Sequence, residues 1–190
     1  MASVEGSWML REKSVSEFSL NPGSKADRLE IEKIAFRDQK PAARSDAERY
    51  LAGSEHTVRQ LEAYLLRRRY IDDVIEEILS WAKRCGLVDD RRYATEFVRS
   101  HSEQSPMGNY RMRIELRKRG VSEQITDDIL TLREESDLRE SLVKKVYEKY
   151  GRLDREKGMR RAAGYLQRRG FQHDLIRGIL TEVFRRKDEV

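Results

Sequence analysis

Hydrophobic residues recur at helical spacing through most of the chain after residue 43. Between Val74 and Ala82 the apolar positions fall four residues apart, with apolar neighbours beside them, which is the pattern of an amphipathic helix with one buried stripe. Further on, Ile125, Ile129 and Leu132 form a comparable stripe. The pattern predicts an all-α protein in which each helix buries one face.

The helical segments repeat with a period of about 50 residues, which lies in the range of helical-repeat units. Residues 65–70 align with residues 116–121 and with residues 166–171. The apolar positions that follow also align: Val74, Ile78 and Leu79 with Ile125, Ile129 and Leu130, and with Leu175, Ile179 and Leu180. Agreement in register over three copies predicts three tandem three-helix repeats that form an elongated, curved array.

Capping residues mark the helix boundaries. In the first repeat, residues 46–52 form the first helix, and Thr57 with Gln60 forms a capping box for the second. The later repeats carry left-handed helix stops at Gly120 and Gly170 and N-caps at Ser122 and Asp154. We therefore place repeat 1 at residues 44–89, repeat 2 at 90–135 and repeat 3 at 136–190.

Residues 1–43 form an N-terminal extension of different character. The segment is rich in serine, and its apolar stretch, residues 29–36, fits either a short helix or a strand before Pro41 closes it. We expect the extension to be partly disordered and residues 1–26 to be dispensable for folding, because their few apolar residues lack a sustained helical period.

Composition narrows the class of protein. Charged residues make up 38% of the chain, well above the roughly 25% of an average globular protein. The net charge is +5, and the first 43 residues carry none of it. A single cysteine, Cys85, excludes an intramolecular disulfide. With no secretory signal and no apolar run of the roughly 20 residues that span a bilayer, we expect a soluble, cytoplasmic monomer without a membrane partner.

Residues typical of catalysis do not cluster in the sequence. The three histidines, His56, His101 and His173, fall in different repeats, and none has a second ligand three or four positions away. Phosphate-binding glycine motifs are absent, and the carboxylates occur as runs typical of solvated helix faces. We expect no catalytic site, metal site or cofactor, so an enzyme is the least favoured class.

Basic residues concentrate in the second helix of each repeat. Residues 105–119 carry a net charge of +4 and residues 155–170 a net charge of +5, whereas the third helix of repeat 2 is acidic. The candidate contacts to nucleic acid or to a filament are Arg67, Arg68, Arg111, Arg113, Arg117, Lys118, Arg160, Arg161, Arg168 and Arg169.

Two interpretations of these charges stay open. Basic and acidic helices that lie side by side can neutralise each other on a charged helical surface. Alternatively, basic helices at the repeat period form a stripe that binds phosphates and gains affinity by counterion release. Tyr64, Tyr110 and Tyr165 lie on or near these helices, but tyrosines at helical spacing are more often part of the core than stacking platforms for bases.

Several segments resemble the RecX family. Residues 86–94, Gly-Leu-Val-Asp-Asp-Arg-Arg-Tyr-Ala, look like the signature that joins the first two repeats there, and residues 97–100 continue it. Repeat 2 resembles the central motif of the family at Gly108, Arg111, Met112, Glu115, Leu116, Arg119, Gly120 and Val121. The ending resembles the family at residues 168–171, Ile176 and Leu180. The resemblance covers about residues 44–185 in repeat order and spacing.

The resemblance implies a regulator of the RecA recombinase, active in recombination, DNA repair and the SOS response. Such proteins bind the RecA filament on single- or double-stranded DNA, lodge along its helical groove, and limit filament growth, ATP hydrolysis and strand exchange without a catalytic site. This chain departs from the family at Arg69, where most members have glycine, so this turn is expected to be built differently.

Two other classes of binding protein remain as alternatives. A stand-alone DNA-binding regulator is suggested by helix pairs such as residues 107–119 and 122–132, which superficially resemble helix-turn-helix units. The second helix of that pair is acidic, which is unsuited to a DNA groove. A protein-only helical scaffold would show little salt-dependent binding of nucleic acid.

Overall fold

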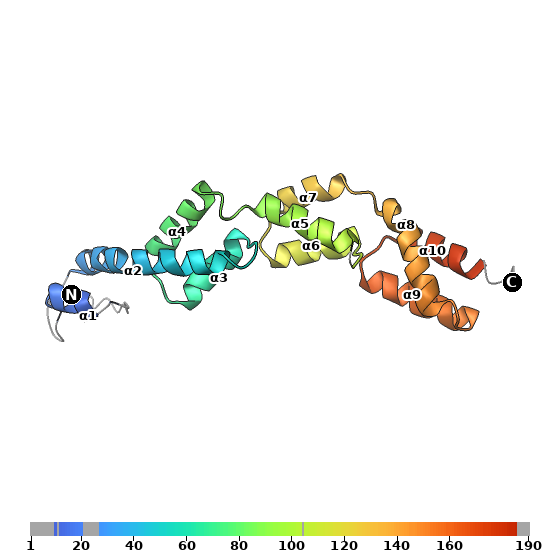
Figure 1. Ribbon diagram of the computed structural model, residues 1–190, viewed down its shortest axis with the longest axis horizontal. Helices are drawn as coiled ribbons and strands as arrows, with labels where there is room; N and C mark the ends of the chain where they lie inside the picture. Colours follow the sequence, from blue (N-terminus) through green and yellow to red (C-terminus); the bar gives the residue numbers. More distant parts are fainter. Residues whose placement is uncertain (1–9, 11, 21–26, 104, 186–190) are drawn as a thin grey trace. The chain divides into compact units, whose positions relative to one another are not determined.

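The computed structural model describes residues 10, 12–20, 27–103 and 105–185, and the chain divides into two compact units, Met1–Asp89 and Asp90–Val190. The first unit contains α1 (Glu12–Glu17), α2 (Arg28–Leu51), α3 (Val58–Arg67) and α4 (Asp72–Arg84). The second contains α5 (Asp90–Glu103), α6 (Asn109–Lys118), α7 (Glu123–Thr131), the 3₁₀ turn η1 (Glu135–Leu138), α8 (Arg139–Tyr150), α9 (Arg155–Arg168) and α10 (His173–Arg185) (Figure 1). The described residues contain helices and no strand, which confirms the predicted all-α fold.

Each repeat has a hydrophobic core of its own. Repeat 1 buries a cluster from α2, α3 and α4, repeat 2 a cluster from α5, α6 and α7, and repeat 3 a cluster from α8, α9 and α10. Leu61, Met112 and Leu142 are fully buried members of the three clusters. The prediction of three tandem three-helix repeats is therefore confirmed, and their arrangement into an elongated, curved array stays a prediction.

Helix α2 differs most from the sequence prediction. The segment 29–36 is helical, and residues 46–52, expected to form the first helix of repeat 1, largely coincide with the C-terminal part of the same helix. Pro41 lies inside α2 and does not end it, so the helix continues through the predicted boundary at residue 43. Because residues 1–9 and 21–26 lie outside the described residues, the expected disorder of the extension and the dispensability of residues 1–26 remain predictions.

The inward stripe of α7 also differs from the prediction. Leu132 was expected to face the core, but it is 87% exposed, whereas Leu130 is only 4% exposed. The buried face of α7 follows Thr126 and Leu130, four residues apart. Leu132 lies two residues beyond Leu130 at the C-cap, about 200° further around the helix, and therefore points away from the core.

The second helix of every repeat ends in the same turn. In repeat 2, Gly120 donates its N–H to Arg117 O (3.0 Å) and Val121 donates to Leu116 O (3.1 Å), which is the Schellman pattern with the residue after the C-cap in the left-handed region. Repeat 3 repeats both bonds around Gly170, and repeat 1 repeats them around Arg69. The φ angles are 61° at Arg69, 86° at Gly120 and 80° at Gly170. The expectation that the Arg69 turn is built differently is therefore wrong.

Replacing Arg69 with glycine should raise the free energy of unfolding by about 0.5–1 kcal/mol, because a side chain in the left-handed region is strained and glycine is not. The Arg69 side chain is exposed and makes no hydrogen bond or ion pair to a described residue, so little is lost with it. Urea unfolding followed by the fluorescence of Trp81, in the same repeat, measures the change. The reverse substitution, Gly120→Arg, should lower the free energy of unfolding. If Arg69→Gly leaves the free energy of unfolding unchanged or lowers it, the backbone at residue 69 is not strained.

Repeats 2 and 3 are joined by backbone contacts within the second unit. Gly108 donates its N–H to Arg169 O at 2.8 Å. A Cβ on Gly108 would lie 2.0 Å from Gly170 O, so the two backbones approach as closely as two glycines allow. The buried Glu135 carboxylate accepts hydrogen bonds from the backbone N–H groups of Asn109 and of Gln172, one from each repeat. These contacts fix the end of α9 against the start of α6.

The joint also uses a half-buried arginine. Arg133 donates from Nε to Ser102 Oγ (3.1 Å) and from Nη2 to Met107 O (2.9 Å), and it also bonds the Asn109 side chain. Burial lowers the pKa of its guanidinium. These hydrogen bonds tie the segment that precedes α6 to the end of α7.

Candidate functional site

The two candidate basic residues of repeat 1 differ in their ion pairs. Arg67 is exposed at the end of α3. Arg68 Nη1 lies 3.1 Å from the carboxylate of Asp46, which is only 5% exposed. Asp46 also accepts a 2.7 Å hydrogen bond from the Tyr70 hydroxyl. Burial, together with the Asp46 carboxylate, raises the pKa of Tyr70 to about 12. Arg68 therefore neutralises a buried carboxylate of its own repeat.

In repeat 2, two of the candidate residues on α6 pair with the acidic helix α7. The guanidinium of Arg113 lies 2.7 Å from Asp127 Oδ1, and that of Arg117 forms an ion pair with Glu123. All four side chains are at least 43% exposed, and exposed pairs of this kind contribute about 0–1 kcal/mol each. The sequence left open whether the acidic helix neutralises the basic one. At Arg113 and Arg117 it does, through these two ion pairs.

The other cations on α6 and at its C-cap pair with the Glu115 carboxylate. Arg119 lies 2.8 Å from its carboxylate, Arg111 also 2.8 Å and Lys118 3.5 Å, while the Glu115 side chain is only 15% exposed. The hydrogen bond from Arg119 and the neighbouring cations lower the pKa of Glu115. The positive charge of α6 is thus largely balanced by carboxylates on α6 and α7.

The basic residues of α9 lie in a different environment. Arg160, Arg161 and Arg168 are exposed, and none of them forms an ion pair with any residue that the structure describes. Together with Tyr150 and Gly164 they line a hollow of about 460 Å³, which we call the α9 hollow. No carboxylate lines it. At these three arginines, the positive charge of repeat 3 is therefore not balanced by a described carboxylate, in contrast to that of α6.

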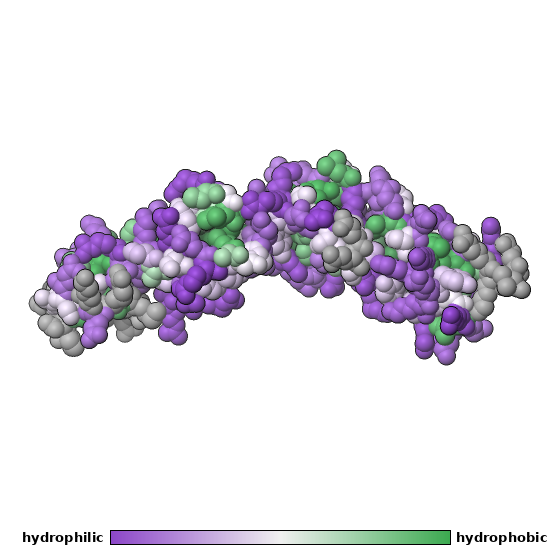
Figure 2. Space-filling view, in the orientation of Figure 1, coloured by the Kyte–Doolittle hydropathy of each residue, from purple (hydrophilic) through white to green (hydrophobic). Residues whose placement is uncertain are grey.

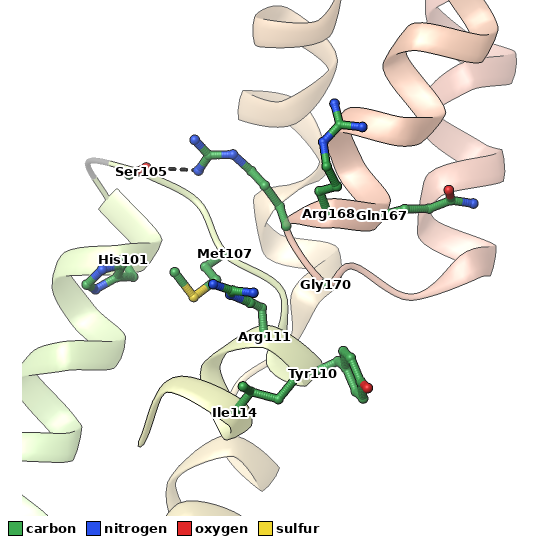
Figure 3. A pocket seen from close by; sticks show the side chains of 10 residues that line it. His101, Ser105, Met107, Tyr110, Arg111, Ile114, Gln167, Arg168 and Gly170 are labelled. Carbon is green, nitrogen blue, oxygen red and sulfur yellow. Dashed lines mark hydrogen bonds between the residues drawn. The ribbon is translucent and has the colours of Figure 1, made fainter. Parts of the chain in front are cut away.

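Arg169 has a structural role at the joint. Its Nη1 donates to Ser105 Oγ and to Pro106 O, both at 2.8 Å, and its guanidinium lies 5.1 Å from the centre of the Tyr165 ring. The Ser105 bond is the dashed line in Figure 3. Removing Arg169 would therefore disturb the contact between repeats 2 and 3 as well as any ligand.

A second hollow, which we call the joint groove, lies between repeats 2 and 3 and has a volume of about 680 Å³. Tyr110, Arg111 and Ile114 of α6 line one side, and residues 167–170 line the other (Figure 3). Arg168 lines the joint groove and the α9 hollow alike. The two hollows are therefore neighbours that share Arg168.

The three tyrosines considered as base-stacking platforms differ in exposure. Tyr64 stacks on Tyr50 with ring centres 4.2 Å apart, and Tyr165 packs against Tyr150 at 5.9 Å. Both are partly buried against the core of their repeats, in keeping with the preference for the core. Tyr110 is 68% exposed at the start of α6 and lines the joint groove.

Sequence reasoning missed two contributors to the α9 hollow. One is Tyr150, which comes from the end of α8. Gly164 forms part of the hollow within α9. A glycine inside a helix is a signal that the sequence does carry, because it costs stability relative to alanine.

Two of the histidines pack against aromatic rings, and His101 also lines the joint groove. His56 stacks on Tyr50 at 4.0 Å, and His101 stacks on Phe97 at 4.1 Å. Within the described ranges no three potential ligands gather as a metal site would require, and no helix is long and apolar enough to cross a bilayer. The face seen in Figure 2 is mainly hydrophilic, as expected for helices that each bury one stripe.

Comparisons with known proteins agree with the three-repeat organisation. Family models match residues 43–81 as the first three-helix domain of RecX, residues 89–130 as the second and residues 134–180 as the third. The regulatory protein RecX of Chlorobium phaeobacteroides (strain BS1) is 33% identical over 139 residues, which cover 72% of this chain and 90% of that protein. The regulatory protein RecX of Streptomyces coelicolor is 30% identical over 157 residues, covering 80% and 83%.

Solved structures show the same fold. A crystal structure of regulatory protein RecX is 25% identical with a TM-score of 0.68, and the match covers 90% of this chain and 85% of that one. The structure of RecX from Lactobacillus salivarius has the same TM-score at 24% identity, covering 81% and 99%. Since the three family domains follow one another in order over more than half of the sequence, the chain belongs to the RecX family of regulatory proteins.

Proposed function

We propose that this protein regulates the RecA recombinase in the cytoplasm by binding its filament on DNA and limiting filament growth, ATP hydrolysis and strand exchange. The observation that carries the proposal is the succession of all three RecX domains along the chain. We expect the protein to act as a monomer and to serve recombination, DNA repair and the SOS response, with no catalytic step of its own.

The distribution of charge supports a binding role toward DNA. The candidate contacts with the strongest support are Arg160, Arg161 and Arg168, whose charges no described carboxylate balances. Arg113 and Arg117 are engaged by α7, so DNA would have to compete with these ion pairs. We therefore place the main nucleic-acid contact on repeat 3 and a weaker one on repeat 2.

A stand-alone helix-turn-helix regulator is less well supported. In the pair formed by α6 and α7, the helix that would enter a DNA groove is α7, whose Asp127 and Asp128 pair with Arg113 and Arg91. A helix that carries these carboxylates on its accessible side would repel phosphates. Strong binding of one duplex sequence without RecA would revive this alternative.

The proposal predicts that the protein lowers DNA-dependent ATP turnover by RecA at substoichiometric ratios, because blocking growth at filament ends stops many subsequent additions. The measurement is RecA ATPase on circular single-stranded DNA, with filament length followed in parallel by light scattering. Heat-denatured protein and protein added without DNA serve as controls. Unchanged turnover and filament length at saturating protein would refute the assignment to RecA and leave the fold intact.

A further inference from the structure

Two glycines inside α9 have opposite environments. A Cβ on Gly158 would lie 2.6 Å from the Phe184 ring and 3.1 Å from Tyr150 O, so packing explains why no side chain is present there. A Cβ on Gly164 would meet only Arg168, with Nη1 at 3.1 Å and Cζ at 4.0 Å, and that guanidinium is the far end of a flexible side chain. Helix packing therefore gives no reason for glycine at residue 164, where alanine would favour the helix.

The surroundings of Gly164 are cationic without a counter-charge. Arg160 lies one turn before it and Arg168 one turn after, and with Arg161 they line the α9 hollow. Because the three arginines line one hollow, their like charges repel each other there, and no described carboxylate lines the hollow to relieve the repulsion. An anion seated in the hollow would turn this repulsion into attraction, and the missing side chain leaves it room.

We propose that the α9 hollow seats one backbone phosphate of single-stranded nucleic acid, and that the strand continues past Arg168 into the joint groove, where a base stacks on Tyr110. The proposal deepens the function proposed above and rests on it only in taking DNA as the ligand. Guanidinium groups match the geometry of a phosphate through paired N–H donors. A shared arginine joins the two hollows into one track along the end of α9.

The joint groove favours nucleic acid over an acidic protein segment. Tyr110 is 68% exposed at the start of α6, and Figure 3 shows it on one side of the groove, with Arg168 at the end of α9 on the other side and its guanidinium pointing away from the ring. An exposed aromatic ring next to an arginine-lined hollow is the combination that single-strand binding proteins use. A carboxylate-bearing peptide would need the arginines but not the ring.

Filling the hollow tests the phosphate seat without changing the charge. In Gly164→Leu, a helix-favouring side chain occupies the space over α9, and the expected result is an equal or higher melting temperature with about tenfold weaker binding of a fluorescent oligo(dT). The salt dependence should fall by about 0.7 in the slope of log affinity against log salt, the share of one phosphate on a single strand. Gly53→Leu is the matched control, because nothing lies within 4 Å of a Cβ at that position.

The stacking platform is tested separately. Tyr110→Leu keeps an apolar side chain but loses the ring, so oligo(dT) affinity should fall about fivefold to tenfold while the salt slope stays constant. Tyr147→Leu, at a tyrosine of α8 that is 57% exposed, is the control and should leave binding unchanged. Equal losses in both tyrosine variants would overturn the role of Tyr110.

Direct DNA binding separates this inference from the RecA assignment. If folded Gly164→Leu binds oligo(dT) with the affinity and salt slope of the unmodified chain, the phosphate seat is wrong, whatever the effect on RecA. If oligo(dT) binding is unchanged but inhibition of RecA ATPase is lost, the hollow takes an acidic protein group, which also overturns the nucleic-acid proposal. If the seat is confirmed while the unmodified chain leaves RecA unaffected, the function proposed above fails instead.

Discussion

Replacing Gly108 with alanine should lower the free energy of unfolding of the second unit by about 2–4 kcal/mol, through overpacking and the loss of hydrogen bonds at the joint. The added Cβ would lie 2.0 Å from Gly170 O and 2.4 Å from Phe171 N, and these are backbone atoms that cannot rotate away. Relieving the clash would break the 2.8 Å hydrogen bond from Gly108 N–H to Arg169 O. It would also pull Asn109 away from the Glu135 carboxylate that links the two repeats.

The two tryptophans make this prediction measurable unit by unit. Both tryptophans, Trp8 and Trp81, precede Asp90 in the sequence, and Trp81 lies on α4 of the first unit. Urea unfolding followed by tryptophan fluorescence should therefore be unchanged in Gly108→Ala, while the transition followed by far-ultraviolet circular dichroism should lose its later part or shift to lower urea. Gly53→Ala, in open space within the first unit, is the control. Coincident, unshifted transitions by both probes would show that the joint tolerates a side chain.

The sequence was most informative where local chemistry decides the structure. The Thr57 capping box forms with Gln60 as expected, and Ser122 and Asp154 accept the hydrogen bonds expected of N-caps. These signals act within three or four residues, so one sequence suffices to identify them. The three-fold repetition of the Leu-X-Arg/Lys-Arg segment likewise predicted where the second helices end.

Features that depend on distant partners were harder to foresee. Leu132 fits a stripe with Ile125 and Ile129, yet α7 buries Leu130 instead, because the neighbouring helices decide which of two overlapping stripes faces the core. The strained Arg69 turn shows that tertiary context can hold a non-glycine residue in a glycine conformation. Local preferences alone favoured a different turn there.

In the candidate site, too, local features could be predicted from the sequence and contacts between helices could not. Net charge marked the second helices of repeats 2 and 3 as equally basic, but it contained no information about pairing. Asp127 and Glu123 reach α6 only because α7 folds back against it, and among the described residues no carboxylate pairs with Arg160 or Arg161 on α9. Gly164 was overlooked because its meaning depends on the cations that surround it in space.

Neutralising the α9 cations should weaken single-stranded DNA binding about tenfold at 0.1 M salt, with a fall of about 0.7 in the slope of log affinity against log salt, the share of the one phosphate seated in the α9 hollow. The variant is Arg160→Gln, Arg161→Gln and Arg168→Gln together. These side chains form no ion pair with a described residue, so their loss should relieve repulsion and leave the melting temperature equal or higher. Binding measured by fluorescence anisotropy over a salt series gives both quantities.

A control variant with the same change in charge decides between the two interpretations of the basic helices. Arg113→Gln, Arg117→Gln and Lys118→Gln also removes three positive charges, but from residues that pair with Asp127, Glu123 and Glu115. It should leave the salt slope nearly unchanged and lower stability by about 1–2 kcal/mol in total, the contribution of a few exposed ion pairs. If both triple variants lose the same slope, DNA binding follows net charge alone and the α9 surface has no special role. If only the α6 variant loses it, the ion pairs open on binding and the contact lies on repeat 2.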